Sequence, residues 1–478
     1  MTAALRRSTL SLAIPNYRRW FYGQVVSISG NWMQTVAEMW LVVHLTGSGV
    51  AVGITAALQF LPILLFGALG GVLADRCDKR RLLMITQTFM AIPALTLFAL
   101  TATGSTQLWM VYGLVLARGI VLAVDNPLRQ SFVMEVVGSD RVVNAVSLNS
   151  VIIHTGRIIG PALAGGVIAL FGLAPCFAFN AASFGAMLIA LGGMDRAALL
   201  PSPRAERAKG QVREAIRDVG SRPALFGPLA MMAVIGTLSF NFQVLLPLFA
   251  KFTWHGTAST YALLTTAMGL GSVGGALAAG ARNRVTPALL AGSALLFGAA
   301  ELGAALAPTL TIQALILAPL GAASVTFAAG VNSSLQLAAD GPSRGRVMSL
   351  YSVVFLGSTP IGAPIVGWLA QAHGPRAGLV VGALAALATG AAAAWWLRRR
   401  MRSRTVVLDD EQQRDHDLRR TRRWLRRGAA PARPAVRRVL RHGRRRAGIG
   451  AGRGPAGARP RRGHRAAERA DAGRAAGR

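Results

Sequence analysis

Twelve stretches of about 20 or more mostly apolar residues follow one another along this chain, and they constrain its fold more than any other feature. A helix needs about 20 such residues to cross a hydrocarbon core about 30 Å thick. The alternation of apolar and polar residues that marks a lipid-facing β-barrel is absent. The sequence therefore predicts an all-α membrane protein with twelve transmembrane helices. The predicted spans are 20–45, 50–73, 82–103, 108–132, 142–171, 174–194, 224–250, 259–281, 286–306, 309–334, 347–372 and 376–397.

Charge is distributed unevenly and separates an apolar body from a basic tail. Residues 1–397 carry 25 Lys+Arg and 12 Asp+Glu, whereas residues 398–478 carry 27 and 7. This pattern excludes an ordinary soluble enzyme, and we expect no catalytic activity. The tail is rich in Arg, Gly, Ala and Pro, so we expect it to be disordered and to contact anionic membrane lipid. No nucleic-acid binding is expected, because Trp424 is the only aromatic residue in the tail. An out-of-frame reading after about residue 425 is the alternative.

Lysine and arginine in the connections between spans predict the orientation of the chain. Connections on one side hold 21 of these residues, whereas those on the other side hold only Lys251 and Arg376. The positive-inside rule therefore places both termini in the cytoplasm. We expect a multi-pass protein of the cell inner membrane. The two cysteines, Cys77 and Cys176, have no His or Cys partner at ligand spacing, so we expect no metal and no cofactor.

A single long polar break divides the spans into six and six. The two halves echo each other in the same direction: Pro161 in the fifth span and Pro364 in the eleventh are 203 positions apart, each among glycines. Chance similarity between Gly/Ala-rich helices is the alternative to two parallel six-helix repeats. The predicted organisation is an N-terminal bundle (1–194), a cytoplasmic linker (195–223), a C-terminal bundle (224–397) and a tail (398–478).

The connection between the second and third spans, GALGGVLADRCDKRR, carries the strongest local motif. Taken alone, the basic cluster is explained equally well as a gate or as a simple anchor of positive charge on the inner side of the membrane. It resembles the signature loop of the major facilitator superfamily, with Asp78 where many members have glycine. The resemblance implies that the loop latches the cytoplasmic side during transport. The matching residues are Gly71, Asp75, Arg76, Lys79 and Arg80.

A second motif, HTGRIIGPALAGG, lies in the fifth span. Its small residues recur every four positions and form a stripe on one helix face, so the alternative reading is ordinary helix packing. The motif resembles the fifth-helix motif of drug and metabolite antiporters in the same superfamily, which favours export over import. The residues assigned to it are Gly156, Gly160, Pro161 and Gly165.

Ionisable residues inside spans are costly and mark candidate functional sites. Glu38, Arg118, Asp125 and Arg157 are assigned to proton coupling or to the cavity. Arg118 and Asp125 are seven residues apart, so the sequence predicts that they share a helix face, an arrangement that allows them to pair. By resemblance, Arg118 is similar to the fourth-helix arginine of the family's proton-relay motif. The alternative for each residue is a paired structural charge. Glu301, near the outer end of its span, is a weaker candidate.

The residues from Gly30 to Ser48, the signature loop and the run Asp125–Val137 together resemble one branch of the superfamily. That branch contains proton-coupled efflux proteins, including enterobactin and macrolide exporters. The resemblance implies a proton-driven exporter of small amphipathic compounds such as drugs or siderophores, working by alternating access. The expected partners are a small-molecule substrate, protons and membrane lipid. An importer of the same fold and a receptor or scaffold that does not transport remain as alternatives.

Overall fold

The computed structural model describes residues 10–200, 217–280 and 285–399, and the described chain is helical throughout, with no strand. Contacts divide the chain into Met1–Met401, which holds every described residue, and Arg402–Arg478. Nearly all of the predicted tail (398–478) and most of the predicted linker (195–223) lie outside the described residues.

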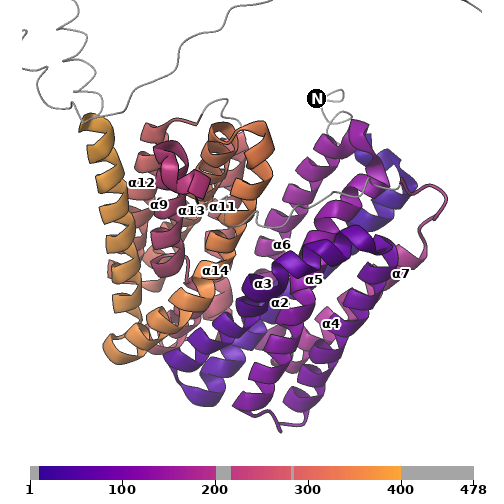
Figure 1. Cartoon of the computed structure of the whole chain (residues 1–478). Helices are drawn as coiled ribbons and strands as arrows, with labels where there is room; N and C mark the ends of the chain where they lie inside the picture. The colour runs from indigo at the N-terminus through magenta and orange to yellow at the C-terminus, as the bar shows by residue number, and fades with distance from the viewer. Residues whose placement is uncertain (1–9, 201–216, 281–284, 400–478) are drawn as a thin grey trace, which may run out of the picture. The chain divides into compact units, whose positions relative to one another are not determined.

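The first six long helices agree closely with the first six predicted spans (Figure 1). Polar caps fix two of their starts, because a side-chain oxygen accepts a bond from an otherwise unpaired backbone N–H. Ser48 accepts from Ala51 N at 3.2 Å, and Asp78 accepts from Arg81 N at 2.9 Å. The helices are α2 (Pro15–Thr46), α3 (Gly49–Arg76), α4 (Lys79–Ala102), α5 (Leu108–Val137), α6 (Val142–Phe171) and α7 (Ala174–Gly192).

The second series begins with an interruption that the sequence did not predict. The expected seventh span, 224–250, is confirmed as a candidate membrane span over Pro223–Thr253. It is not one continuous helix, because it is broken between α9 (Pro223–Leu238) and α10 (Phe242–Leu248), with a π-helical turn η3 (Phe249–Thr253) after it. Side chains supply bonds at the break, where Ser239 Oγ donates to the Gly382 carbonyl and Asn241 Nδ2 to the Thr237 carbonyl, both at 2.7 Å. The remaining helices are α11 (Ala258–Gly280), α12 (Pro287–Leu306), α13 (Leu310–Ala338), α14 (Gly341–His373) and Pro375–Arg399.

Eleven helices of the described chain are long and apolar enough to cross a membrane. Eleven of the twelve predicted transmembrane helices therefore have a counterpart among these helices. The exception is α2, which has 32 residues but buries polar side chains along its length, among them Gln24, Gln34 and Glu38. Its polar content has a consequence for function, because these side chains face other helices rather than lipid.

The helices pack in two series that meet mainly through two pairs. Within the first series α2 packs on α6 and α7, and α3 on α5; within the second, α11 and α12 pack on α13, and α14 on α9. Between the series, α3 packs against α14 and α6 against α11. A glycine permits the second crossing, because a Cβ at Gly269 of α11 would lie 2.8 Å from the Arg157 carbonyl oxygen of α6.

Hydrogen bonds between the two series gather at one end of the helices. Ser48 Oγ donates to Gln371 Oε1 at 2.7 Å, and Lys251 Nζ donates to the Val43 carbonyl at 2.8 Å. These residues adjoin the connections that the charge bias predicts to be outside. This end therefore holds the two series together.

Candidate functional site

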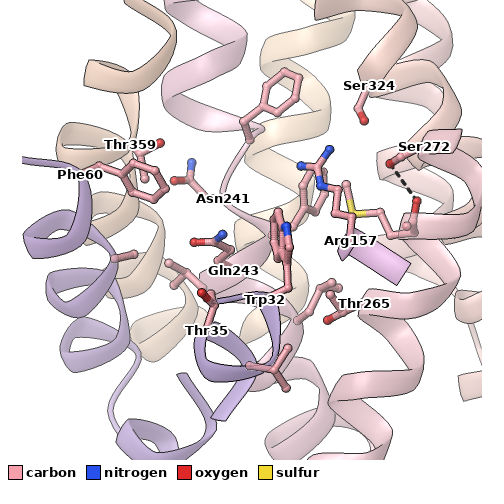
Figure 2. A pocket seen from close by; sticks show the side chains of 18 of the residues that line it. Trp32, Thr35, Phe60, Arg157, Asn241, Gln243, Thr265, Ser272, Ser324 and Thr359 are labelled. Atoms are coloured by element: carbon pink, nitrogen blue, oxygen red, sulfur yellow. Dashed lines mark hydrogen bonds between the residues drawn. The ribbon is translucent and has the colours of Figure 1, made fainter. Parts of the chain in front are cut away.

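A cavity of about 250 Å³ lies between the two series of helices. Its walls come from α2, α3 and α6 on one side and from the α9–α10 break, α11, α13 and α14 on the other (Figure 2). A second cavity of about 580 Å³ adjoins it and is lined mainly by α2, α5 and α6. The residues that line both cavities are Trp32, Thr35, Phe60 and Gln243.

A buried ion pair stands at the wall of the larger cavity. Arg118 Nη2 of α5 donates to Glu38 Oε2 of α2 at 2.7 Å. Arg118 lines the cavity, whereas Glu38 lies behind it with 0% exposure. The other carboxylate oxygen accepts from Gln34 Nε2 at 2.6 Å. The guanidinium of Arg118 therefore lies between the Glu38 carboxylate and the larger cavity.

A chain of amides continues from this pair to α7. Asn180 Nδ2 donates to Gln34 Oε1, and Ser183 Oγ donates to Asn180 Oδ1 at 2.9 Å. Gly30 permits this close approach of α2 and α7, because it has no Cβ; an added Cβ would lie 2.6 Å from Asn180 Oδ1. The carboxylate of Glu38 is thus oriented by side chains from three helices.

The pairing of Arg118 with Asp125 that the sequence allows does not form. Seven residues of helix rise about 10.5 Å, which separates the two side chains along the axis even though they share a face. Asp125 instead pairs with Arg129, its neighbour one turn on. Arg118 is left to bond across the helix interface to Glu38.

Asp125 belongs to a second polar cluster that joins three helices. Its Oδ1 accepts from Thr86 Oγ1 at 2.7 Å and from Gln87 Nε2 at 2.8 Å, both on α4. Arg129 also donates to Gln87 Oε1 at 2.9 Å and to Gln24 Oε1 of α2 at 2.5 Å. Asp125 and Arg129 line the larger cavity, so this cluster forms its polar wall.

Arg157 of α6 lines the smaller cavity and is held differently from the other intramembrane charges. Its guanidinium lies 5.2 Å from the centre of the Trp32 ring (Figure 2). Within the described chain it makes no ion pair and no hydrogen bond. A cation–π contact contributes about 0.5–2 kcal/mol, whereas an arginine at a helix centre costs about 2.5–3.5 kcal/mol on insertion scales. The contact therefore offsets only part of the cost.

The signature loop places its basic residues in three environments. Arg76 is exposed, whereas Lys79 is buried and pairs with Glu135 of α5. Arg80 is also buried, and it donates to the carbonyls of Leu191 at 2.7 Å and Gly192 at 2.8 Å. These carbonyls end α7, where a cation meets the negative end of the helix dipole. The surroundings of Gly71 and the side chain of Asp75 lie outside what the structure describes.

The small residues of α6 lie against two partners. A Cβ at Gly160 would lie 2.5 Å from Trp32 Cβ, and one at Gly156 would lie 2.6 Å from Ile28 Cγ2, both on α2. Gly165 faces α11 instead, where an added Cβ would lie 2.7 Å from Ala262 Cβ. Pro161 is buried beside Gly160.

Two further ionisable groups occupy apolar surroundings. Glu301 of α12 is 0% exposed, and its carboxylate oxygens have no hydrogen-bond partner among the described residues. The Ser239 hydroxyl lies beside this carboxyl group but donates to Gly382. His154 has a buried Nδ1 with no hydrogen-bond partner in the described chain.

Several residues of these clusters escaped the sequence reasoning, which considered only ionisable groups within spans. Buried amides inside apolar stretches carry the same signal, because an unpaired amide is also costly in hydrocarbon. Arg129 lies at the end of the predicted span 108–132 and was counted with the connection that follows, and Glu135 lies beyond that span, but α5 extends to Val137 and contains both. The residues missed in this way include Gln24, Gln34, Gln87, Asn180, Arg129 and Glu135.

Long apolar helices in two series around a polar cavity define a membrane transporter of the major facilitator fold rather than an enzyme. Residues 8–418 match the transmembrane secretion effector family of that superfamily. The chain belongs to this family.

Curated relatives with assigned substrates include two siderophore transporters. The chain is 26% identical over 373 residues to the enterobactin exporter of Citrobacter koseri, covering 76% of this chain and 87% of that protein. It is 28% identical over 254 residues to the staphyloferrin A transporter of Staphylococcus aureus, covering 51% of this chain and 62% of that protein.

Solved structures share the fold at low identity. A bacterial homologue of the human lysosomal transporter Spinster, in an inward-facing unoccupied conformation, superposes with a TM-score of 0.62 at 14% identity over 79% of this chain and 94% of that one. A D-xylose–proton symporter gives 0.60 at 14% over 80% and 96%. These likenesses concern the fold alone.

Proposed function

We propose that this protein is a proton-driven exporter of small amphipathic compounds in the cell inner membrane, with both termini in the cytoplasm. The halves 1–194 and 224–397 move relative to each other about the linker 195–223, and the signature loop latches the cytoplasmic side. Membrane lipid surrounds the helices and contacts the basic tail.

The buried Glu38–Arg118 pair beside the cavity is the observation that carries this proposal. A carboxylate in hydrocarbon is stabilised either by a cation or by a proton. Arg118 supplies the cation in this structure. A proton on Glu38 would release the arginine and disturb the cavity wall that a solute binds, whereas a solute bound against the intact pair opposes protonation. Binding of solute and binding of a proton to the pair then exclude each other in part, which is what antiport requires.

The arrangement of contacts supports alternating access. The series meet at the end that carries Ser48 and Gln371, which the charge bias predicts to be outside. The larger cavity extends toward the opposite end, where Gln24, Arg129 and Asn149 line it. The structure therefore fits a state that is closed outside and open toward the cytoplasm.

The direction of transport rests on the relatives, one of which is named an enterobactin exporter. Energetics allow it: one proton moving inward releases about 2.3 kcal/mol per 100 mV and about 1.36 kcal/mol per pH unit. Together, these terms of about 3.7 kcal/mol hold a neutral solute at a gradient on the order of 500-fold.

Everted membrane vesicles test the coupling. Respiration acidifies their interior, and a panel of antimicrobials and siderophores is screened for compounds that dissipate the pH gradient only when the protein is present. Glu38→Gln is expected to abolish this solute-evoked proton movement while the protein remains folded, because an amide accepts no exchangeable proton. Undiminished coupling in Glu38→Gln would remove this residue from the mechanism.

Glu301→Gln is the matched control, since it makes the same chemical change at a buried intramembrane glutamate that lines neither cavity. We expect this variant to retain the signal. Loss of coupling in both variants would mean that Glu38 has no specific part. Solute entry without proton movement in the wild type would refute antiport.

A further inference from the structure

The smaller cavity carries an unbalanced positive charge. Among the described residues that line it, Arg157 is the only ionisable one that is charged at neutral pH. Glu38 and Asp125 are engaged by Arg118 and Arg129 and line no part of this cavity. The contact with Trp32 holds the guanidinium in place without neutralising it. A partly buried cation of this kind is complementary to an anion that arrives with the solute.

Two side-chain oxygens that accept no hydrogen bond lie across the cavity from the Arg157 guanidinium. Asn241 Oδ1 and Gln243 Oε1 are buried and have no hydrogen-bond partner among the described residues. Asn241 lies in the break between α9 and α10, and Gln243 lies in the first turn of α10. Figure 2 shows them on the far side of Trp32 from Arg157. Unpaired buried acceptors favour a ligand that brings hydroxyl or amide donors.

The rest of the wall is apolar and aromatic. Phe60, Phe240 and Phe355 line the cavity together with Trp32. Phe240 is fixed by ring contacts to Phe355, with centroids 6.0 Å apart. Flat aromatic walls suit a planar or ring-containing body.

We propose that this cavity binds a small organic acid, with its carboxylate on Arg157, its ring system against the aromatic wall, and a hydroxyl or amide group donating to Asn241 or Gln243. This assignment rests on the proposed transport function and names the chemical class of its substrate. The halves of the protein would share the ligand, because the cation lies on α6 and the acceptors lie at the α9–α10 break and at the start of α10.

Binding of a matched pair of probes to the purified full-length protein tests the assignment. The acid 6-hydroxy-2-naphthoate and its neutral amide differ in charge but keep the same ring and a hydroxyl group at the far end from the acid. Equilibrium dialysis at neutral pH is expected to show the acid bound about 10- to 100-fold more tightly, the range of a hydrogen bond to a charged group. An acid that binds no more tightly than its amide, including the case in which neither binds, would overturn the proposal.

Arg157→Gln should remove the preference by weakening the acid at least about tenfold while leaving the amide nearly unchanged. Retained amide binding reports that the variant is folded. Arg376→Gln is the matched control: its guanidinium also lies over a tryptophan ring, Trp254 at 6.0 Å, but outside the cavity. We expect it to bind the acid as the wild type does. Unchanged acid binding in Arg157→Gln would refute the role of the arginine.

The binding assay uses no gradient, so its failure is separable from failure of the proposed function. Acid-selective binding in a protein that moves no protons would refute coupling and leave the anion site standing. Solute-evoked proton movement in a protein that does not prefer the acid would do the reverse.

Discussion

Replacing Arg118 by methionine leaves the carboxylate of Glu38 in the membrane with Gln34 as its hydrogen-bond donor. Removing one partner of a buried ion pair costs about 3–5 kcal/mol. Protonation of Glu38 sets an upper limit on this cost, because the carboxyl group can take a proton instead of remaining as an unpaired charge. For a glutamic acid with the usual reference pKa of about 4.3, taking a proton at pH 7 costs about 3.7 kcal/mol. The two figures agree, and we expect Arg118→Met to lower the free energy of unfolding by about 3–4 kcal/mol.

The double variant Glu38→Gln/Arg118→Met discriminates an ion pair from two independent packing residues. It removes both charges together, and a glutamine amide can still bond to Gln34. Replacing a buried pair by uncharged groups is often nearly neutral, so we expect the double variant to lie within about 1 kcal/mol of the wild type.

Reversible unfolding in mixed micelles, titrated with SDS and followed by circular dichroism, measures these free energies. Arg81→Met is the control, because Arg81 pairs with Asp78 at the exposed surface at 3.5 Å and surface pairs contribute about 0–1 kcal/mol. The reasoning is refuted if the double variant is destabilised by the sum of the two single changes.

Two further predictions concern the packing of helices and the closure of the cavity. Gly160→Ala would place a Cβ 2.5 Å from Trp32 Cβ and is expected to cost about 1–3 kcal/mol, whereas Gly166→Ala, with nothing within 4 Å of the added Cβ, should be neutral or stabilising. Size-exclusion chromatography after a heating series compares their stability, and equal losses would contradict the packing assigned to α6. Cysteines introduced at Ser48 and Gln371, in a background without the native cysteines, should be joined by a short bifunctional reagent that forms reducible disulfides with both thiols. The cross-link should stop transport until it is reduced. Transport at an undiminished rate in the cross-linked protein would contradict closure at this end.

The positions of the helices followed from the sequence because hydrocarbon leaves the backbone few choices. A segment in lipid must satisfy its own N–H and C=O groups, so an apolar stretch of sufficient length becomes a helix. The break at Ser239–Asn241 had no such signal, since neither glycine nor proline lies within it and its bonds come from distant Gly382 and from Asn241 itself.

The sequence predicted which charged residues belong to the candidate site better than it predicted which of them form ion pairs with one another. Glu38, Arg118, Asp125 and Arg157 are recognisable as charges within apolar stretches. Their partners are not, because the rotation of one helix against another decides which groups meet. Arg118 finds Glu38 at a separation of 80 residues, whereas sequence spacing allowed a partner on its own helix.

An acidic substrate would alter the energetics of export. Inward movement of a proton in exchange for outward movement of a monoanion transfers two charges, which releases about 4.6 kcal/mol per 100 mV. The membrane potential then contributes twice as much as it does for a neutral solute.

Reconstitution of the purified protein in liposomes with an internal pH dye tests the central claim most directly. A solute identified in the vesicle screen is added to one side in the absence of any other gradient. We predict that protons move in the direction opposite to the solute, and that neither protein-free liposomes nor the Glu38→Gln protein give this signal. Protons that travel with the solute, or solute that crosses with no proton movement, would contradict the account.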